Sequence, residues 1–124
     1  METTKNLSAL IIDDEYDICF LLSKILHTNN LSVQFVNSLE DGKILLEKTH
    51  PNVLFLDNHL PDGLGVDFIG YVKENYPATK VVMVTAHDTS EDRQKALQKG
   101  ADIFIPKPFS AAEIKAVIEK VNIA

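Results

Sequence analysis

Five short apolar runs alternate with five amphipathic segments along the chain, and this alternation most restricts the possible fold. The runs have the length of strands, and the segments between them carry apolar residues at helical spacing. The fourth helical segment, residues 90–99, has the fewest apolar positions. Such alternation with short connections predicts right-handed crossovers and a parallel sheet with helices on both faces. The predicted strands are residues 7–12, 31–36, 53–56, 80–85 and 101–105.

Five such units are too few for an eight-stranded barrel. We therefore expect an α/β fold: a three-layer (βα)5 flavodoxin-like sandwich around a parallel five-stranded sheet of order 2-1-3-4-5, counted along the chain. The second strand alternates apolar and polar residues, which is typical of a sheet edge. The inner faces of the helices are expected to include Leu21, Ile44 and Leu97. No linker or repeat divides the sequence, so we predict a single domain over residues 1–124.

The composition excludes several functional classes. The formal net charge is −6 and no basic run is present, which disfavours direct nucleic-acid binding. The single cysteine, Cys19, cannot form an internal disulfide, which fits a reducing compartment. No apolar stretch is long enough to span a membrane, and the N-terminal residues lack the apolar core of a signal peptide. These features predict a cytoplasmic protein without a membrane partner.

Polar side chains that could bind a ligand or take part in a reaction follow the predicted strands. Asp13 and Asp14 come after the first strand, Asp57 after the third, Thr85 ends the fourth and Lys107 follows the fifth. The carboxyl ends of parallel strands lie along one edge of a sheet, so these residues can converge. In the order 2-1-3-4-5 the first and third strands are neighbours at the point where ligands bind. The three aspartates are therefore predicted to share one crevice.

Three carboxylates in one crevice repel each other unless a cation offsets their charge. Oxygen ligands without a cysteine or histidine pattern favour Mg²⁺, which keeps waters and phosphoryl oxygens as its other ligands. Lys107 as a point charge and Thr85 as a hydroxyl donor would suit a phosphoryl group. Because a carboxylate can act as a nucleophile, Asp57 is the candidate for an aspartyl-phosphate, with Asp13 and Asp14 holding the metal.

Each of these residues also has an ordinary structural explanation. Asp57 could cap a helix or open a turn, and the Asp13–Asp14 pair could interact with a helix dipole. Thr85 is a favourable strand residue, and Lys107 could be a solvated loop charge. Their joint placement at successive strand ends favours the functional interpretation, because four independent coincidences would otherwise be needed.

At these positions the chain resembles the receiver domain of two-component response regulators, over its whole length. The segments that carry the resemblance are Ile11–Glu15, Leu56–Gly65, Val84–Ala86 and Gly100–Phe109. The resemblance implies that Asp57 accepts a phosphoryl group from a sensor histidine kinase or a histidine phosphotransfer protein. It also implies phosphorelay signalling in which the domain controls a downstream protein or output domain, with slow self-dephosphorylation as its only further chemistry.

The resemblance further implies a role for each site residue. Asp14, Asp57 and the backbone carbonyl of His59 would ligate Mg²⁺, and Asp13 would act through water.

Thr85 and the backbone N–H of Ala86 would hold the phosphoryl oxygens, and Lys107 would pair with one of them. Thr85 and Phe104 would form the switch that alters the face made by the fourth helix, fifth strand and fifth helix. The Lys107–Pro108 bond resembles the family's cis peptide.

Two histidines, His59 and His87, fall at positions that flank the phosphoryl group in this fold. We predict that they make dephosphorylation pH-dependent in the range where histidine titrates. The alternative is that both are exposed loop residues. Phe104 stands where the family often has tyrosine, so a tyrosyl hydroxyl bond is not expected here.

Two other classes of protein compete with this interpretation. A Mg²⁺-dependent phosphohydrolase would carry an Asp-x-Asp pair after its first strand, whereas this chain has Asp13-Asp14. A flavodoxin-like cofactor binder would need a phosphate loop, but the first strand–helix turn here is acidic. The sequence leaves open whether the chain is a stand-alone regulator or part of a longer one, and whether phosphorylation drives dimerisation.

Overall fold

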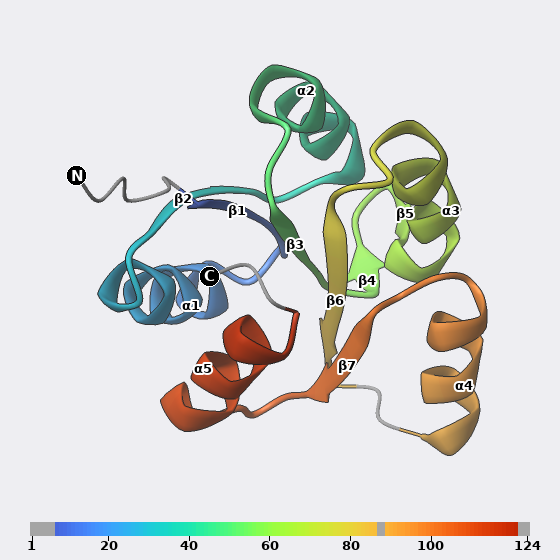
Figure 1. The fold of residues 1–124 in the computed structure, drawn as a ribbon. Coiled ribbons are helices and arrows are strands. Elements are labelled where there is room, and N and C mark those ends of the chain that lie inside the picture. Colours follow the sequence, from blue (N-terminus) through green and yellow to red (C-terminus); the bar gives the residue numbers. More distant parts are fainter. Residues whose placement is uncertain (1–6, 87–88, 122–124) are drawn as a thin grey trace.

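The computed structural model describes residues 7–86 and 89–121 (Figure 1). Seven strands and five helices lie in these residues. The strands are β1 (Leu7–Ile12), β2 (Leu31–Val36), β3 (Val53–Leu56), β4 (His59–Leu60), β5 (Gly63–Leu64), β6 (Lys80–Thr85) and β7 (Ile103–Pro106). The helices are α1 (Tyr16–Thr28), α2 (Leu39–Thr49), α3 (Gly65–Asn75), α4 (Ser90–Gln98) and α5 (Ala111–Lys120). No helix among these residues is both long and apolar enough to cross a membrane.

The central sheet has five parallel strands in the order β2-β1-β3-β6-β7. This is the predicted order 2-1-3-4-5, because β4 and β5 form a separate antiparallel pair just after β3. The predicted fold class and the position of β2 at the sheet edge are therefore confirmed. All four residues of β3 are buried, as expected for the centre of a parallel sheet.

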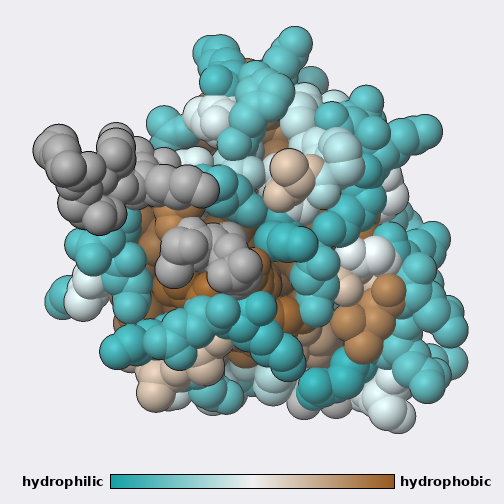
Figure 2. All heavy atoms as spheres, in the orientation of Figure 1, coloured by the Kyte–Doolittle hydropathy of each residue, from teal (hydrophilic) through white to brown (hydrophobic). Residues whose placement is uncertain are grey.

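Helices cover both faces of the sheet and create two hydrophobic cores (Figure 1). Alternate residues along β1 divide between them: Ala9 and Ile11 face α1 and α5, whereas Leu10 and Ile12 face α2, α3 and α4. The strand period of two explains this division. Figure 2 shows that hydrophilic residues cover most of the visible surface and that hydrophobic residues are visible between α1 and α5.

Local signals in the sequence set the ends of several helices. Ser38 accepts a hydrogen bond from the backbone N–H of Asp41 at the start of α2. Ser110 and Glu113 form a complete capping box at the start of α5. Asn30, just after α1, has a positive φ of 71°, a conformation that asparagine tolerates. Polar side chains therefore cap the starts of α2 and α5, and a left-handed asparagine follows the end of α1.

Three predicted inner-face residues point outward instead. Leu21, Ile44 and Leu97 are 47%, 48% and 46% exposed, so these predictions are wrong. In α2 the buried residues are Gly42 and Leu46, and Gly42 lies so close to Ile12 that a Cβ there would meet the isoleucine side chain. Consecutive apolar residues on a helix leave the inward position ambiguous, since any one of them can complete the stripe.

Candidate functional site

The site begins where β1 and β3 end side by side. The backbone N–H of Asp57 donates to the carbonyl of Ile12 at 2.9 Å, and that of Asp13 donates to Val36 at 3.1 Å. These bonds continue the sheet by one step and fix both aspartates beyond the last strand residues. The two residues are buried, with exposed fractions of 2% for Asp13 and 6% for Asp57. Sheet pairing therefore brings together two carboxylates that are 44 positions apart in the sequence.

The carboxylates of Asp13, Asp14 and Asp57 form one cluster. Each offers an oxygen, and these oxygens all lie within 4.8 Å of one another. Two of these carboxylates also accept local hydrogen bonds: Asp13 Oδ1 accepts from the N–H of Glu15 at 2.9 Å, and Asp57 Oδ1 accepts from the N–H of Asn58 at 2.8 Å. The donor set contains oxygen alone, which is the set that hard divalent cations prefer. The predicted convergence of the three aspartates is therefore seen in the structure, in a form that could hold a metal.

Lys107 reaches this cluster from the end of β7. Its N–H donates to the carbonyl of Thr85 at 2.9 Å, and the Lys107–Pro108 peptide bond is cis. The ammonium lies 2.9 Å from Asp13 Oδ2 and 3.7 Å from Asp57 Oδ2. It lies 2.6 Å from Glu15 Oε1, although the lysine side chain is only 9% exposed. An enclosed cation thus faces three carboxylates.

Burial and mutual repulsion shift the protonation of these groups. Burial, and then the charge of Asp13, raises the pKa of Asp57 to about 6. Burial likewise raises the pKa of Asp13 above its ordinary value, against the opposing effect of Lys107. Burial would lower the pKa of Lys107, but hydrogen bonds to Glu15 and Asp13 raise it overall. Without a further cation, ionisation of both Asp13 and Asp57 therefore costs free energy in the folded protein.

The remaining predicted residues line the same cavity. Thr85 is buried at 2% exposure, whereas Ala86 and His59 are exposed on its rim. The cavity has a volume of about 320 Å³ and is lined by Asp14, Glu15, Asp57, His59, Thr85, Ala86 and Lys107. His87 lies outside the described residues, so its predicted position beside the acceptor stays a prediction.

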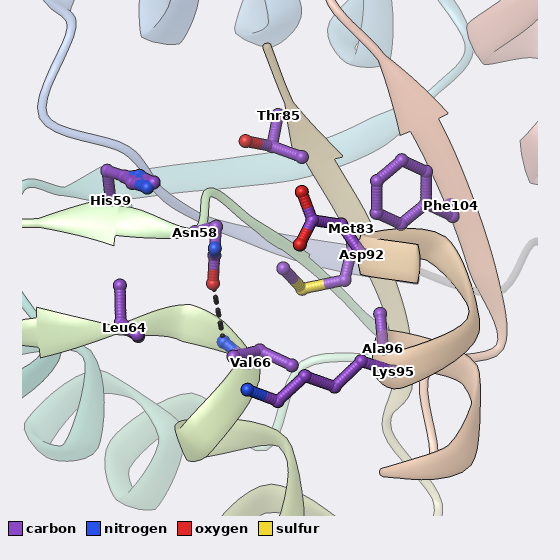
Figure 3. A pocket seen from close by; sticks show the side chains of 10 residues that line it. All are labelled: Asn58, His59, Leu64, Val66, Met83, Thr85, Asp92, Lys95, Ala96 and Phe104. Carbon is purple, nitrogen blue, oxygen red and sulfur yellow. Dashed lines mark hydrogen bonds between the residues drawn. The ribbon is translucent and has the colours of Figure 1, made fainter. Parts of the chain in front are cut away.

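A second cavity, of about 260 Å³, lies behind Thr85 and beneath α4 (Figure 3). Met83 and Phe104 line it on the sheet side, and Asp92 lines it from α4. Phe104 is 8% exposed, and the guanidinium of Arg93 lies 5.0 Å from the centre of its ring. The switch residue predicted from the sequence is therefore enclosed between the sheet and α4.

Several residues that shape the site were missed by the sequence analysis. Asn37 Nδ2 donates to the carbonyl of Asp13 at 2.8 Å, and Cys19 Sγ donates to the same oxygen at 3.3 Å. Asn58 Oδ1 accepts from the N–H of Val66 at the start of α3, at 2.9 Å (Figure 3). A Cβ on Gly65 would meet the backbone oxygen of Asp57. Gly63 and Gly65 follow Asp57 in the sequence, but their spacing does not reveal this close approach.

Comparison with known proteins agrees with the geometry. The family model described as "Response regulator receiver domain" matches residues 9–119. The response regulator PilR of Pseudomonas aeruginosa is 32% identical over 110 residues, covering 89% of this chain and 25% of that protein. The phosphate regulon regulator PhoB of Escherichia coli is 33% identical over 119 residues, covering 91% and 52%. The chain thus spans about a quarter to about half the length of these relatives.

Solved structures are similar over almost the whole chain. The solution structure of the beryllofluoride-activated NtrC4 receiver domain dimer is 33% identical, with a TM-score of 0.87, and the match covers 92% of this chain and 94% of that one. Both comparisons identify the same fold. In this chain that fold brings Asp13, Asp14, Asp57 and Lys107 together at the carboxyl end of the sheet. With the family model covering residues 9–119, this chain belongs to the response regulator receiver domains of two-component systems, a family of regulatory switches.

Proposed function

We propose that the chain is a phosphorylation-controlled binding module whose phosphoryl acceptor is Asp57. The observation that carries the proposal is the buried carboxylate of Asp57 at the carboxyl end of β3, beside Asp13 and 3.7 Å from the ammonium of Lys107. We infer that one receiver domain extends over residues 1–124 and acts in the cytoplasm. The donor is a sensor histidine kinase or a histidine phosphotransfer protein.

Mg²⁺ is the cofactor that fits the donor set. Asp14, Asp57 and the backbone carbonyl of His59 would hold it directly, and Asp13 would hold it through water. The raised pKa values of Asp57 and Asp13 support this assignment, because burial disfavours the charged form of both carboxylates and the charge of Lys107 does not fully offset it. When bound, the metal offsets the carboxylate charge and binds phosphoryl oxygens.

Phosphoryl transfer needs a nucleophile and donors for the phosphoryl oxygens. An oxygen of Asp57 forms the new bond to phosphorus, while the bond from phosphorus to the donor imidazole breaks and its electron pair stays on the imidazole nitrogen. The hydroxyl of Thr85 and the backbone N–H of Ala86 donate to the phosphoryl oxygens, and Lys107 pairs with one of them. Attack by water on the same phosphorus later breaks its bond to the Asp57 oxygen, which releases inorganic phosphate and returns Asp57 to a free carboxylate.

The switch follows from the position of Thr85 between the two cavities. Thr85 lines both the acceptor cavity and the cavity that holds Phe104. Movement of Thr85 toward the phosphoryl group changes the space beside Phe104, and so the face made by α4, β7 and α5. A downstream protein or output domain reads this face, and a phosphorylation-dependent dimer is one form that the readout can take. Nucleic acid is not bound by this domain itself.

The test is intact mass after incubation with acetyl phosphate, with and without Mg²⁺, for the wild type and Asp57→Asn. We expect one phosphoryl-sized gain that needs Mg²⁺ and is absent in the variant. A gain that persists in Asp57→Asn would contradict the assignment of the acceptor. Steady turnover of a small phosphoester would instead favour a phosphohydrolase, and a yellow purified protein would favour a flavin binder.

His59 and His87 would then influence how long the phosphoryl group persists. The position of His59 in the lining of the acceptor cavity supports this role. We predict that the hydrolysis rate of the phosphoprotein changes between about pH 5.5 and 8, where histidine titrates. A flat profile would contradict this role.

A further inference from the structure

The ammonium of Lys107 is shared unequally among three carboxylates. It lies 2.6 Å from Glu15, 2.9 Å from Asp13 and 3.7 Å from Asp57. The first two distances are hydrogen bonds, whereas the third is an ion pair without one. In the unphosphorylated protein, the cation is therefore held nearer to Glu15 than to the proposed phosphoryl acceptor.

The buried position of the Lys107 ammonium limits the hydrogen-bond partners that it can reach. The side chain of Lys107 is 9% exposed, so its three N–H donors cannot all turn to bulk water. Glu15, in contrast, has a side chain that is 60% exposed and reaches in from the rim. Its backbone is fixed, because its N–H donates to Asp13 Oδ1 at 2.9 Å and its carbonyl accepts from the N–H of Cys19 at 3.1 Å. The start of α1 thus sets where the glutamate carboxylate lies.

We propose that Glu15 is a positioning residue for Lys107, which holds the ammonium away from Asp57 and so weakens the binding of a phosphoryl group there. The inference rests on the proposed function. A phosphoryl oxygen on Asp57 must take a donor of Lys107 in competition with Glu15. Removing the glutamate charge leaves Asp13 and the phosphoryl group as the partners of the ammonium.

The size of the effect follows from the exposure of the pair. An ion pair with one exposed partner contributes little, so its removal should tighten anion binding about two- to fivefold. The same factor should appear as a longer lifetime of the phosphorylated protein, if Lys107 stabilises that state more than the transition state of hydrolysis.

The experiment compares Glu15→Gln with the wild type. Gln keeps the length of the side chain and leaves the backbone bonds in place. Beryllofluoride binding is measured by ¹⁹F NMR at saturating Mg²⁺, and we expect an affinity about two- to fivefold higher in the variant. The matched control is Asp17→Asn, which removes one charge from the same first turn of α1. This control should change the affinity much less.

A second comparison separates positioning from plain charge repulsion. In a Lys107→Met background the effect of Glu15→Gln should vanish, and the nitrogen signal of the Lys107 ammonium should shift in Glu15→Gln but not in Asp17→Asn. An undiminished effect without Lys107 would overturn the proposal, as would equal effects of the two α1 variants. If Glu15→Gln is unfolded by circular dichroism, Glu15→Asp, which keeps the charge on a shorter side chain, replaces it and should also tighten binding.

The two proposals fail in different ways. Wild-type protein that binds no beryllofluoride and gains no phosphoryl mass with Mg²⁺ would contradict the proposed function. Wild-type protein that does both, together with an unchanged affinity in Glu15→Gln, would contradict the role of Glu15 alone.

Discussion

The acceptor pocket and α4 are held in very different ways. Around Asp57, backbone bonds to neighbouring strands and three carboxylate contacts of Lys107 leave each group with defined partners. Among the residues that the structure describes, α4 has Ala96 as its buried residue, whereas α5 buries Ile114, Val117 and Ile118. A cavity of about 260 Å³ also lies beneath α4.

This difference indicates where a local change of charge can alter the structure. A new charge in a tightly bonded pocket changes the free energy of the folded protein strongly, because the surrounding groups cannot move away from it. A helix with few buried apolar contacts is displaced at low cost. The two regions meet at Thr85 and Phe104. A rigid pocket around Asp57 therefore lies next to a helix, α4, that can move at low cost. Three measurements test this difference between the acceptor pocket and α4.

The largest effect is expected from Gly65→Ala. The added methyl group would meet the backbone oxygen of Asp57, so the acceptor loop or α3 must shift. We expect the free energy of unfolding to fall by about 3 kcal/mol, measured by urea denaturation. Gly70→Ala is the matched control in the same helix, because apart from its chain neighbours and its own helix backbone no described atom lies within 4 Å of its Cβ position. That control should be stabilised by about 1 kcal/mol. Equal effects of the two changes would show that the pocket is not tight.

Asp57→Asn should stabilise the metal-free protein at neutral pH. The pKa of Asp57 is raised from 3.8 to about 6, so the folded protein binds this proton more tightly than the unfolded chain. The resulting stability is fully present below pH 3.8 and is lost as the pH rises through about 6. Asn carries no charge, and we expect a gain of about 1–3 kcal/mol at pH 7.5.

The gain should disappear near pH 4 and shrink when Mg²⁺ is added, as thermal melts across pH would show. A variant that is less stable than the wild type at pH 7.5 without metal would contradict the view that the pocket is short of positive charge.

A smaller effect is expected from Arg93→Ala. The guanidinium covers the ring of Phe104 at 5.0 Å, and Lys43 in α2 covers the ring of Tyr71 in α3 at 4.9 Å. Each contact should contribute about 0.5–1 kcal/mol. If α4 is the compliant element, Arg93→Ala should also speed amide hydrogen exchange in α4, whereas Lys43→Ala should leave it unchanged. The same exchange rates in both variants would argue against a link between α4 and Phe104.

The sequence predicted the sheet because strand pairing follows from simple rules. Residues 53–56 form an unbroken apolar run, and β-α alternation leaves few possible topologies. The convergence of Asp13, Asp57 and Lys107 then follows from parallel strands in the order 2-1-3-4-5, which is expected from the fold class. Their roles in phosphoryl transfer stay predictions, because geometry places side chains without demonstrating chemistry.

The parts that could not be predicted depend on side-chain direction. Glu15 follows two aspartates, and nothing in its position along the chain says that it turns back to Lys107, 92 residues later. Asn58 stabilises the start of α3 only because the β4–β5 pair brings the chain back to Val66. Ile44 was assigned to the wrong face since three apolar residues follow one another in α2, and the contact of Gly42 with Ile12 decides among them.

The β4–β5 pair has a further consequence, for the cooperativity of folding. Asp62 lies in the turn between β4 and β5 and accepts hydrogen bonds from the backbone N–H groups of Leu39 and Glu40 at 2.9 and 3.0 Å. These bonds lower the pKa of Asp62 and satisfy two donors at the start of α2 that the helix itself cannot satisfy. The first turn of α2 is thus completed by a residue more than twenty positions later in the chain. Unfolding of the β4–β5 turn would therefore also remove two hydrogen bonds from the start of α2, so we expect the two segments to open together.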